Sequence, residues 1–437
     1  MGALRKLCLP LSGLAALALV AGLVLGSPGL WQPAAVIAAL ALALGLGAVP
    51  SLKGYQFTAW ILVAVVAAML YPAAFLRWGD FDLRNKWLIL VVVQLVMFGM
   101  GTQMSLHDFA GVAKAPRGVL VGILCHFSVM PIVGWTLTKV FHFEPEIAAG
   151  IILIGSCSSG LASNVMTYIA KANLPLSVTV TAVTTLVAPI MTPLLMKLLA
   201  GTLVEVKFMN LMIEIIKIVI VPIAAALIHD HLKRVTPESL RRWTLAAVLC
   251  SLGAVAVFIT HDAPWMPVRL ASVQMTYELA GFGLAAVAFG VWYHKLTRAF
   301  PSLDGWMPVV SMFGIVYFTT VTTAAGRDNL LKVGALLFVA SALHNAAGYF
   351  FGYWLSRGAG LDKNSARSVA FEVGLQNGGM ASGLAGAMGK LATVGLAAAI
   401  FSPWMNISGS ILANYWGRRP VKDGSAGETS PPSTPSP

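Results

Sequence analysis

The stretch Phe371-Glu-Val-Gly-Leu-Gln-Asn-Gly-Gly-Met-Ala-Ser-Gly383 places a carboxylate, two amides and four glycines in a strongly apolar part of the chain. A continuous helix in an apolar medium would leave these polar groups unpaired, and each unpaired group is costly there. The stretch is therefore either a loop in water or a site that is built to hold a ligand.

The composition identifies the surrounding medium. The 437 residues are 58% hydrophobic and 11% charged, with a mean hydropathy of +0.80, whereas soluble domains carry about 25% charged residues. Segments such as 57–76 and 178–199 are long enough to cross roughly 30 Å of hydrocarbon as helices. The sequence therefore predicts an all-α polytopic membrane protein. Its net charge of +12 is spread over the loops, which a positive-inside bias explains, so we expect a lipid bilayer and no nucleic acid as partner.

Breaks in the apolar pattern divide the chain into expected membrane segments. They lie near 11–27, 33–48, 56–76, 87–104, 117–140, 147–170, 174–200, 208–228, 243–260, 276–294, 307–324, 330–356, 365–389 and 392–416. Lys and Arg are more numerous in the loops on the side of Met1, although Arg77, Arg84 and Lys86 fall on the other side. This distribution favours an inner (plasma) membrane protein with both termini in the cytoplasm.

Three local features bear on processing and redox state. Arg5 and Lys6 before segment 11–27 also fit a secretory signal peptide, although we favour a retained helix. The residues after Ser425 are rich in Pro, Ser and Thr and predict a disordered tail. The four cysteines show no paired spacing, which indicates reduced packing residues and neither disulfides nor metal ligands.

A second polar break occurs at Gly155-Ser-Cys-Ser-Ser-Gly-Leu-Ala-Ser-Asn164. Each break lies in the last third of its half of the chain, inside an apolar segment. Matched Gly-interrupted segments in two halves are typical of inverted repeats around a central binding site. Small residues could instead serve only close helix packing, but that explanation does not account for Glu372, Gln376 and Asn377.

These motifs resemble those of the bile acid:sodium symporter family. The resemblance rests on Glu372-Val-Gly-Leu-Gln-Asn377, on Gly160-Leu-Ala-Ser-Asn-Val-Met-Thr-Tyr-Ile-Ala-Lys171 and on Trp404-Met-Asn-Ile-Ser-Gly-Ser-Ile-Leu-Ala-Asn-Tyr-Trp416. It covers roughly 56–235 and 305–418. It implies two inverted five-helix repeats, which form a core domain and a panel domain with two discontinuous crossing helices, plus about four additional helices.

The resemblance also divides the chain. Two extra N-terminal helices occupy 1–54, the first repeat 55–201 and the start of the second repeat 202–235. An inserted pair of helices occupies 236–304, the remainder of the second repeat 305–419 and the disordered tail 420–437. We expect the extra helices to lie at the periphery against the panel, outside the transport path.

The resemblance implies two sodium sites. The ligands of the first would be Ser163, Asn164, Ser177, Thr181 and Glu372. Ser177 and Thr181 are spaced i, i+4 and so share a helix face, and a carboxylate within a membrane segment is a functional candidate by default.

The second site would use Val373, Leu375, Gln376, the Glu372 carbonyl and His126, which stands where the family has glutamine. Imidazole nitrogen is a poor sodium ligand, and its pKa suits proton handling. His126 is therefore a packing residue, the cause of a weakened second site, or a proton carrier.

Further departures concern the substrate. Cys157-Ser-Ser-Gly160 lacks the proline that the family has before its first crossing, and Leu161 and Met405 replace polar family residues. The candidate substrate-binding residues are Asn377, Leu161, Asn164, Met405 and Asn406. Helix N-termini favour anions, which suits an organic anion, either bile-acid-like or a small carboxylate. His344 and Asn345 are expected to support the core, and Glu214 with Lys217 to form a structural pair.

We therefore predict a sodium-coupled symporter of an organic anion that works by alternating access. The alternatives are a proton-coupled transporter that uses His126 and Glu372, or a membrane ligand sensor that does not transport. The sequence contains no GxxxxGK[ST], HExxH or GxSxG motif, which argues against an ATP-driven pump or a hydrolase. The oligomeric state is left open.

Overall fold

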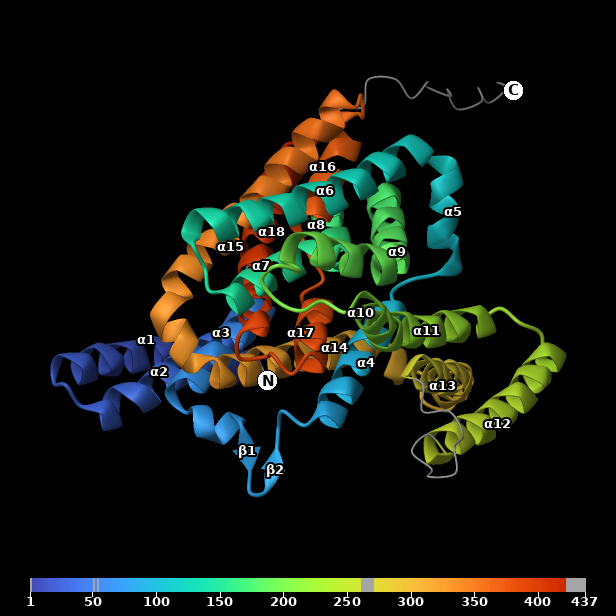
Figure 1. The fold of residues 1–437 in the computed structure, drawn as a ribbon. Helices are drawn as coiled ribbons and strands as arrows, with labels where there is room; N and C mark the ends of the chain where they lie inside the picture. Colours follow the sequence, from blue (N-terminus) through green and yellow to red (C-terminus); the bar gives the residue numbers. More distant parts are fainter. Residues whose placement is uncertain (1, 50–51, 53–54, 261–270, 422–437) are drawn as a thin grey trace, which may run out of the picture.

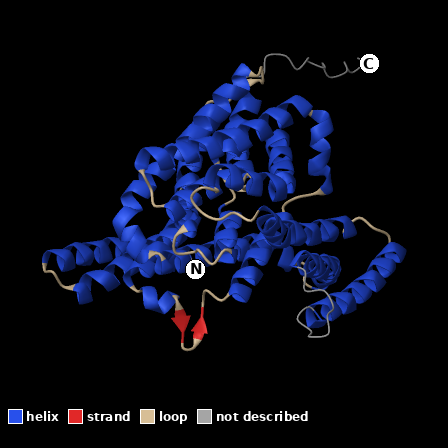
Figure 2. Cartoon of the chain, in the orientation of Figure 1, coloured by secondary structure: helices blue, strands red, loops and turns tan. Residues whose placement is uncertain are grey.

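The computed structural model describes residues 2–49, 52, 55–260 and 271–421. They form a helical molecule with one short hairpin, whose strands are β1 (Arg77–Trp78) and β2 (Phe81–Asp82) (Figure 2). The expected disordered tail lies almost wholly outside the described residues. Ten helices within the described ranges are long and apolar enough to cross a membrane. The predicted all-α polytopic membrane fold is confirmed.

The helices of the first half of the chain are α1 (Gly2–Val24), α2 (Pro28–Leu46), α3 (Gln56–Leu70), α4 (Lys86–Gly101), α5 (Leu106–Lys114), α6 (Pro116–Phe141), α7 (Pro145–Ser156), α8 (Ala162–Ile169) and α9 (Leu174–Ala200). A 3-10 turn, Pro72–Phe75, follows α3. Several of these helices begin with proline, whose missing N–H is not needed in the first turn. The amphipathic helix α5, which was not predicted, begins with a capping box of Ser105 and Asp108.

The helices of the second half are α10 (Phe208–Ile215), α11 (Val221–Leu232), α12 (Pro237–Thr260), α13 (Ala271–Ala299), α14 (Ser302–Ala325), α15 (Arg327–Gly358), α16 (Lys363–Gly374), α17 (Gly378–Ala387) and α18 (Val394–Gly417). A π-helical turn, Ile216–Ile220, joins α10 to α11. The expected segments 147–170 and 365–389 are each broken, into α7 with α8 and into α16 with α17. The two predicted discontinuous helices are therefore present.

Two groups of helices surround these breaks (Figure 1). In one group α6 packs on α7, α9 and α15, and α18 packs on α7 and α15. In the other group α14 packs on α3 and α4, and α4 packs on α11. The broken helix α16–α17 joins the groups, because α16 packs on α15 and α6 whereas α17 packs on α4 and α18.

The additional helices lie against the second group. Helices α1 and α2 pack on each other, and α2 packs on α3. Helices α12 and α13 likewise form a pair, and α13 packs on α11. In Figure 1 the two pairs extend from opposite sides of the molecule. Both pairs are anchored to helices that do not contain the polar breaks.

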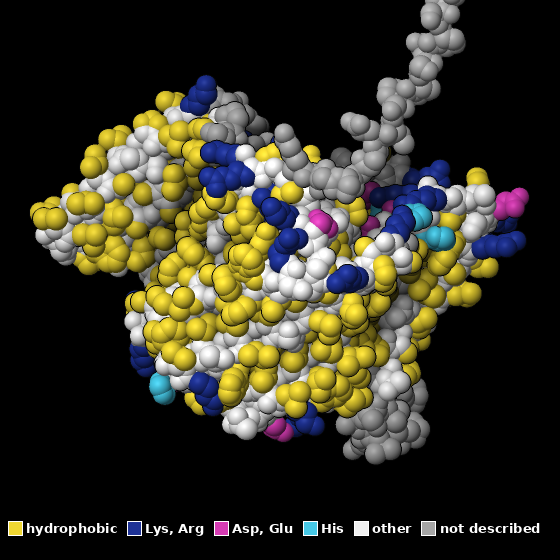
Figure 3. Space-filling model, turned by 90° about the horizontal axis from the view of Figure 1, so that it is seen from above, with side chains coloured by type: hydrophobic (Ala, Val, Ile, Leu, Met, Phe, Trp, Pro, Cys, Tyr) yellow, Lys and Arg dark blue, Asp and Glu magenta, His cyan; other side chains and the backbone are white. Residues whose placement is uncertain are grey.

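The outer surface is suited to lipid. In Figure 3 hydrophobic side chains cover much of the visible face, and most of the Lys and Arg side chains lie across its upper part. Large apolar side chains such as Leu124, Leu252 and Phe313 are exposed on the long helices. Exposed apolar area of this extent is rare on soluble monomers, so a hydrocarbon environment explains it.

Candidate functional site

The two helix breaks pair with each other. The Asn377 amide donates to the Ser158 carbonyl at 2.8 Å, and the Gly160 amide donates to the Leu375 carbonyl at 3.1 Å. Ser159 and Gln376 thereby form a one-residue antiparallel bridge. Backbone groups that the breaks release are thus satisfied by the opposite break, which lets irregular backbone exist at depth in a membrane.

Gly160 is required at this crossing. A Cβ atom added to it would lie 2.7 Å from the carbonyl oxygen of Gln376, which is closer than any real contact. Glycine permits this approach because it has no side chain. The helix break thus forms at Cys157-Ser-Ser-Gly160 without a proline in that run.

An oxygen cluster surrounds Glu372, whose side chain is fully buried. Its Oε1 accepts hydrogen bonds from Ser163 Oγ at 2.5 Å and from Ser177 Oγ, and its Oε2 accepts one from Thr181 Oγ1 at 2.8 Å. Asn164 Oδ1 lies 2.9 Å from Ser177 Oγ and 3.3 Å from Thr181 Oγ1. The structure thus brings all five residues of the first predicted sodium site together.

This cluster has more acceptors than protons. Ser163, Ser177 and Thr181 each carry one hydroxyl proton, yet each lies within hydrogen-bond distance of two or more oxygen acceptors. The acceptors include an ionisable carboxylate and an amide oxygen. Buried oxygens in such excess suit a hard cation, which is bound by carboxylate, carbonyl and hydroxyl oxygens.

His126 bridges the two breaks. Its Nδ1 lies 2.9 Å from the Glu372 carbonyl oxygen, and its Nε2 lies 2.8 Å from the Cys157 carbonyl oxygen. Both partners can only accept, and a neutral imidazole carries one N–H. Only the doubly protonated ring makes both hydrogen bonds. Neither ring nitrogen is directed at the oxygen cluster.

The other residues of the second predicted sodium site mostly bond to protein. Gln376 Nε2 donates to the Val373 carbonyl at 2.7 Å, and the Leu375 carbonyl accepts from Gly160. The exception is Gln376 Oε1, a buried oxygen with no hydrogen-bond partner among the described residues. Among the predicted sodium ligands that the structure describes, the buried side-chain oxygen without a partner therefore belongs to the second site.

The candidate substrate residues are divided in the structure. Asn377 is the N-cap of α17, because its Oδ1 accepts from the Met380 amide at 2.9 Å, and Leu161 is the residue before α8. Both stand at the crossing, beside the oxygen cluster that contains Asn164. Asn406 instead donates to the Ser402 carbonyl of its own helix, and Met405 is buried on that helix.

Three residues at the crossing escaped the sequence interpretation. Ser159 Oγ donates to the Leu375 carbonyl at 3.3 Å, Thr167 Oγ1 donates to Ser177 Oγ at 3.1 Å, and Cys157 contributes its carbonyl to His126. Thr167 could have been found, because it lies four residues after Ser163 and therefore on the same face of α8. A contact made by a backbone carbonyl does not depend on residue type, so the sequence could not indicate it.

The residues expected to support the core do contact it. Asn345 Nδ2 donates to the Gly374 carbonyl at 2.8 Å, which holds the end of α16. Ser408 Oγ in turn donates to Asn345 Oδ1 at 2.5 Å. His344 Nε2 lies 2.8 Å from the Met130 carbonyl and so joins α15 to α6.

Lys217 has a second carboxylate partner that the sequence did not reveal. Its Nζ lies 2.7 Å from Glu214 Oε1, as the spacing predicted, and 3.2 Å from Glu278 Oε1 of the inserted helix α13. Glu278 also lines a cavity with Gly383 of α17. Helix α13 therefore shares this cavity with α17 of the second broken helix, and neither Asn164 nor Asn377 lines it.

Comparisons with known proteins define the class and then the family. A solved structure of the sodium proton antiporter MjNhaP1 from Methanocaldococcus jannaschii shares the fold, with a TM-score of 0.54 and 11% identity over 89% of this chain and 97% of that chain. The chain thus shares the all-α membrane fold of that protein. The model of the sodium bile acid symporter family matches residues 90–262.

Relatives extend this match over most of the chain. The uncharacterized sodium-dependent transporter YocS of Bacillus subtilis is 32% identical over 86% of this chain and 95% of its own length. The probable sodium/metabolite cotransporter BASS1 of Arabidopsis thaliana is 28% identical over 84% and 74%. The human ileal sodium/bile acid cotransporter is 26% identical over 66% and 65%. The chain belongs to the sodium bile acid symporter family, as its motifs predicted, and this is a family of transporters and not of enzymes.

Proposed function

We propose that this protein is a sodium-coupled symporter of an organic anion, in which sodium binds at the oxygen cluster around Glu372. The observation that carries this proposal is the excess of buried oxygen acceptors over hydroxyl protons. A sodium ion would accept lone pairs from Ser163, Ser177, Thr181 and Asn164, and its charge would balance the Glu372 carboxylate. The relatives named above include sodium-dependent transporters and cotransporters, which supports the same ion.

The proposed coupling runs through the crossing. Ser163 and Asn164 belong to α8, Ser177 and Thr181 to α9, and Glu372 to α16. Sodium would draw these three helices together and so hold the two paired breaks in one conformation. Asn377 and the N-terminus of α17 would face the substrate there. The substrate then meets a complete site only when sodium is bound, and this difference in affinity is the coupling free energy.

The substrate is proposed to be an organic anion, either bile-acid-like or a small carboxylate. The N-termini of α8 and α17 meet at the crossing, and helix N-termini attract negative groups. Leu161 and Asn377 would contact the substrate there. Met405 and Asn406 are proposed as more distant contacts, because the Asn406 amide is engaged within α18.

Alternating access would arise from rocking of the helix group that contains the breaks against the other group. The matched positions of the two breaks support inverted five-helix repeats over 55–201 and over 202–235 with 305–419, separated by the inserted pair 236–304. The distribution of Lys and Arg supports a plasma-membrane (inner-membrane) location with both termini in the cytoplasm.

A second candidate is proton coupling through His126 and Glu372. The contacts of both His126 ring nitrogens with carbonyl oxygens favour it, because protonation satisfies both contacts. In that case the positive charge that the resemblance assigns to a second sodium ion would come from the imidazolium. Coupling would then be to one sodium ion and one proton site, or to protons alone.

The decisive experiment uses proteoliposomes with imposed gradients. Uptake of radiolabelled taurocholate and of pyruvate, as probes of the two substrate classes, is measured with a sodium gradient, with a proton gradient and with neither. Accumulation driven only by sodium supports the proposal, whereas accumulation driven only by protons supports the second candidate. Saturable sodium-dependent binding without accumulation would identify a sensor instead.

A further inference from the structure

A polar cavity lies where the inserted helices meet the rest of the molecule. It has a volume of about 400 Å³ and is formed by the end of α11, the start of α12, the end of α13 and the start of α14. Four helix ends meet only where helices leave the membrane, so the cavity stands at one membrane surface. Its charged and imidazole side chains are Lys233, His294, Arg298 and Asp304.

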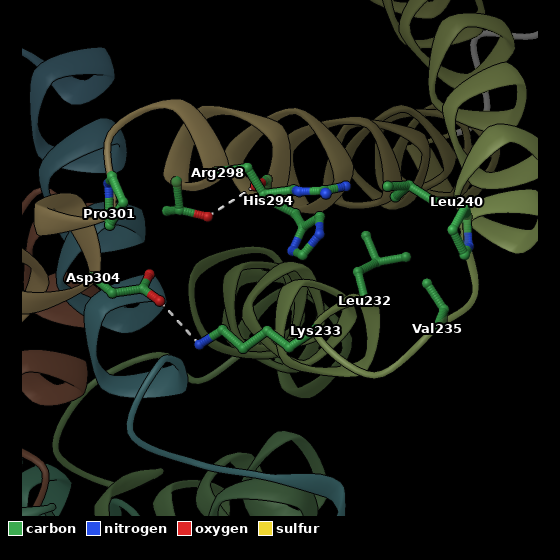
Figure 4. Close-up of a pocket in the computed structure, with 10 residues that line it drawn as sticks. Leu232, Lys233, Val235, Leu240, His294, Arg298, Pro301 and Asp304 are labelled. Carbon is green, nitrogen blue, oxygen red and sulfur yellow. Dashed lines mark hydrogen bonds and ion pairs between the residues drawn. The ribbon is translucent and has the colours of Figure 1, made fainter.

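One cation of the cavity is already neutralised. Lys233 Nζ lies 2.9 Å from Asp304 Oδ2, and Asp304 Oδ1 accepts from Tyr293 at 3.1 Å and lies 3.1 Å from His229 Nε2. Figure 4 shows Lys233 extending toward Asp304 while His294 and Arg298 project from α13. The charges of Lys233 and Asp304 therefore offset each other, and the charge of Arg298 is left over among the side chains that line the cavity.

Two side chains of the cavity have nitrogen atoms without a hydrogen-bond partner in the described part of the chain. Arg298 makes no ion pair or hydrogen bond through its guanidinium within the described ranges, and its side chain is exposed. His294 is 5% exposed and lines the cavity, and its Nδ1, which donates in the tautomer that carries the proton there, has no partner among the described residues. A buried polar atom without a partner is costly. The cationic Arg298 beside this buried nitrogen indicates an anionic ligand, and guanidinium groups bind phosphate particularly well.

An apolar groove lies farther into the membrane, on α11 and α13, which also help to form the polar cavity. It has a volume of about 240 Å³ and is lined by Leu95 and Phe98 of α4, Ala225 of α11, and Phe282, Ala286 and Phe289 of α13. Its apolar lining suits a hydrocarbon chain.

The polar cavity and the groove are a short distance apart. From Phe289 of the groove to His294 of the cavity is five residues of α13, or about 7.5 Å at the rise of a helix. The polar headgroup zone of a bilayer is about 5–7 Å deep on each side of the hydrocarbon. The spacing therefore matches that between a lipid phosphate and its acyl chain.

We propose that this site binds one anionic phospholipid, with its phosphate between Arg298 and His294 and an acyl chain in the groove between α4, α11 and α13. The lipid fixes the inserted pair of helices to α11 and α14. Basic pockets between membrane helices are suited to lipid headgroups. The groove favours a lipid over a free phosphate ion, which could use only the polar cavity. The inference does not depend on which substrate or ion the protein transports.

The test is a lipid titration of the detergent-purified, delipidated full-length protein, followed by thermal unfolding. Phosphatidylglycerol is compared with phosphatidylcholine of the same acyl chains and with inorganic phosphate. We expect phosphatidylglycerol to raise the Tm more than phosphatidylcholine does, and inorganic phosphate to have no comparable effect. Equal effects of the two lipids would overturn the proposal, and an equal effect of inorganic phosphate would identify a free-anion site instead.

Two variants locate the effect. Arg298→Gln should weaken the apparent affinity for phosphatidylglycerol about fivefold. The matched control is Lys295→Gln on the same helix, because Lys295 lies over the Trp292 ring at 5.4 Å and does not line the cavity. Ala286→Trp, which fills the groove, should also weaken the apparent affinity for phosphatidylglycerol. Equal losses of phosphatidylglycerol affinity in Arg298→Gln and Lys295→Gln would contradict the proposed site. The comparison of lipids on the wild-type protein stands even if a variant fails to fold.

Discussion

Ser163 on the first broken helix and Glu372 on the second are joined by a hydrogen bond of 2.5 Å across 209 positions of the chain. Through this contact a hydroxyl from one half of the protein and a carboxylate from the other share one buried cluster. A cation bound there touches both halves at once. The proposed coupling depends on that relationship, because an ion that contacts only one half could not couple its binding to the relative movement of the two halves.

The hydroxyl ligands should each contribute a part of the sodium affinity. Ser177→Ala and Thr181→Ala each remove one neutral oxygen that contacts Glu372, so each should weaken sodium binding by less than Glu372→Gln does. Sodium-dependent thermal stabilisation of the purified variants measures this. Thr136→Ala is the control, since Thr136 donates only to Ile132 of its own helix. Unchanged sodium responses in both site variants would remove Ser177 and Thr181 from the ligand set.

Gly160 should be intolerant of a side chain. Gly160→Ala places a methyl group 2.7 Å from the Gln376 carbonyl oxygen, and relief of such overpacking costs about 1–3 kcal/mol. The paired breaks would separate, so both thermal stability and sodium affinity should fall. Gly358→Ala is the matched control, because no atom lies within 4 Å of a Cβ added there. Equal behaviour of the two variants would show that the crossing is looser than the structure indicates.

Sodium affinity should depend on pH through His126. The protonated ring, which contacts the Glu372 carbonyl, would add a positive charge beside the proposed second sodium site. Repulsion would cost about 1–4 kcal/mol for a sodium ion roughly 4 Å away at intermediate dielectric. Because protonation increases as pH falls, sodium affinity should decrease as pH falls through the histidine pKa. His126→Gln should flatten this dependence and raise the Hill coefficient for sodium. A wild-type protein that binds two sodium ions cooperatively, with no pH dependence within about a unit of pH 6.5, would make His126 a packing residue.

Lys217 should be needed to hold the inserted helix α13. Lys217→Met leaves Glu214 and Glu278 without their shared cation. Breaking a fully buried pair costs about 3–5 kcal/mol. The loss here should be smaller, since the two carboxylates are 32% and 24% exposed. Lys207→Met is the control, because its pair with Glu205 is largely exposed and exposed pairs contribute little. Equal Tm values for the two variants would contradict a structural role for Lys217.

The sequence could predict the parts of the site that side chains define. Ser177 and Thr181 share a face through their spacing, and Glu372 stands out because a carboxylate is rare in an apolar segment. The bridge between Ser159 and Gln376 was not predictable, since backbone pairing of two irregular segments does not depend on residue type. The contact of His126 with Cys157 escaped for the same reason. Glu278 was not predicted because the motif resemblance does not extend over 236–304, so nothing in the pattern indicated which face of α13 meets Lys217.

The most direct test is a sodium titration of the purified wild-type protein and of Glu372→Gln, by isothermal calorimetry at constant ionic strength. The substitution keeps the shape of the side chain but removes the charge that balances the ion. Glu146→Gln is the matched control, because Glu146 pairs with Lys390 in a partly exposed position outside the crossing. The account predicts that Glu372→Gln weakens sodium binding at least about tenfold, or 1.4 kcal/mol, and that Glu146→Gln binds like wild type. A folded Glu372→Gln protein with wild-type sodium affinity would contradict it.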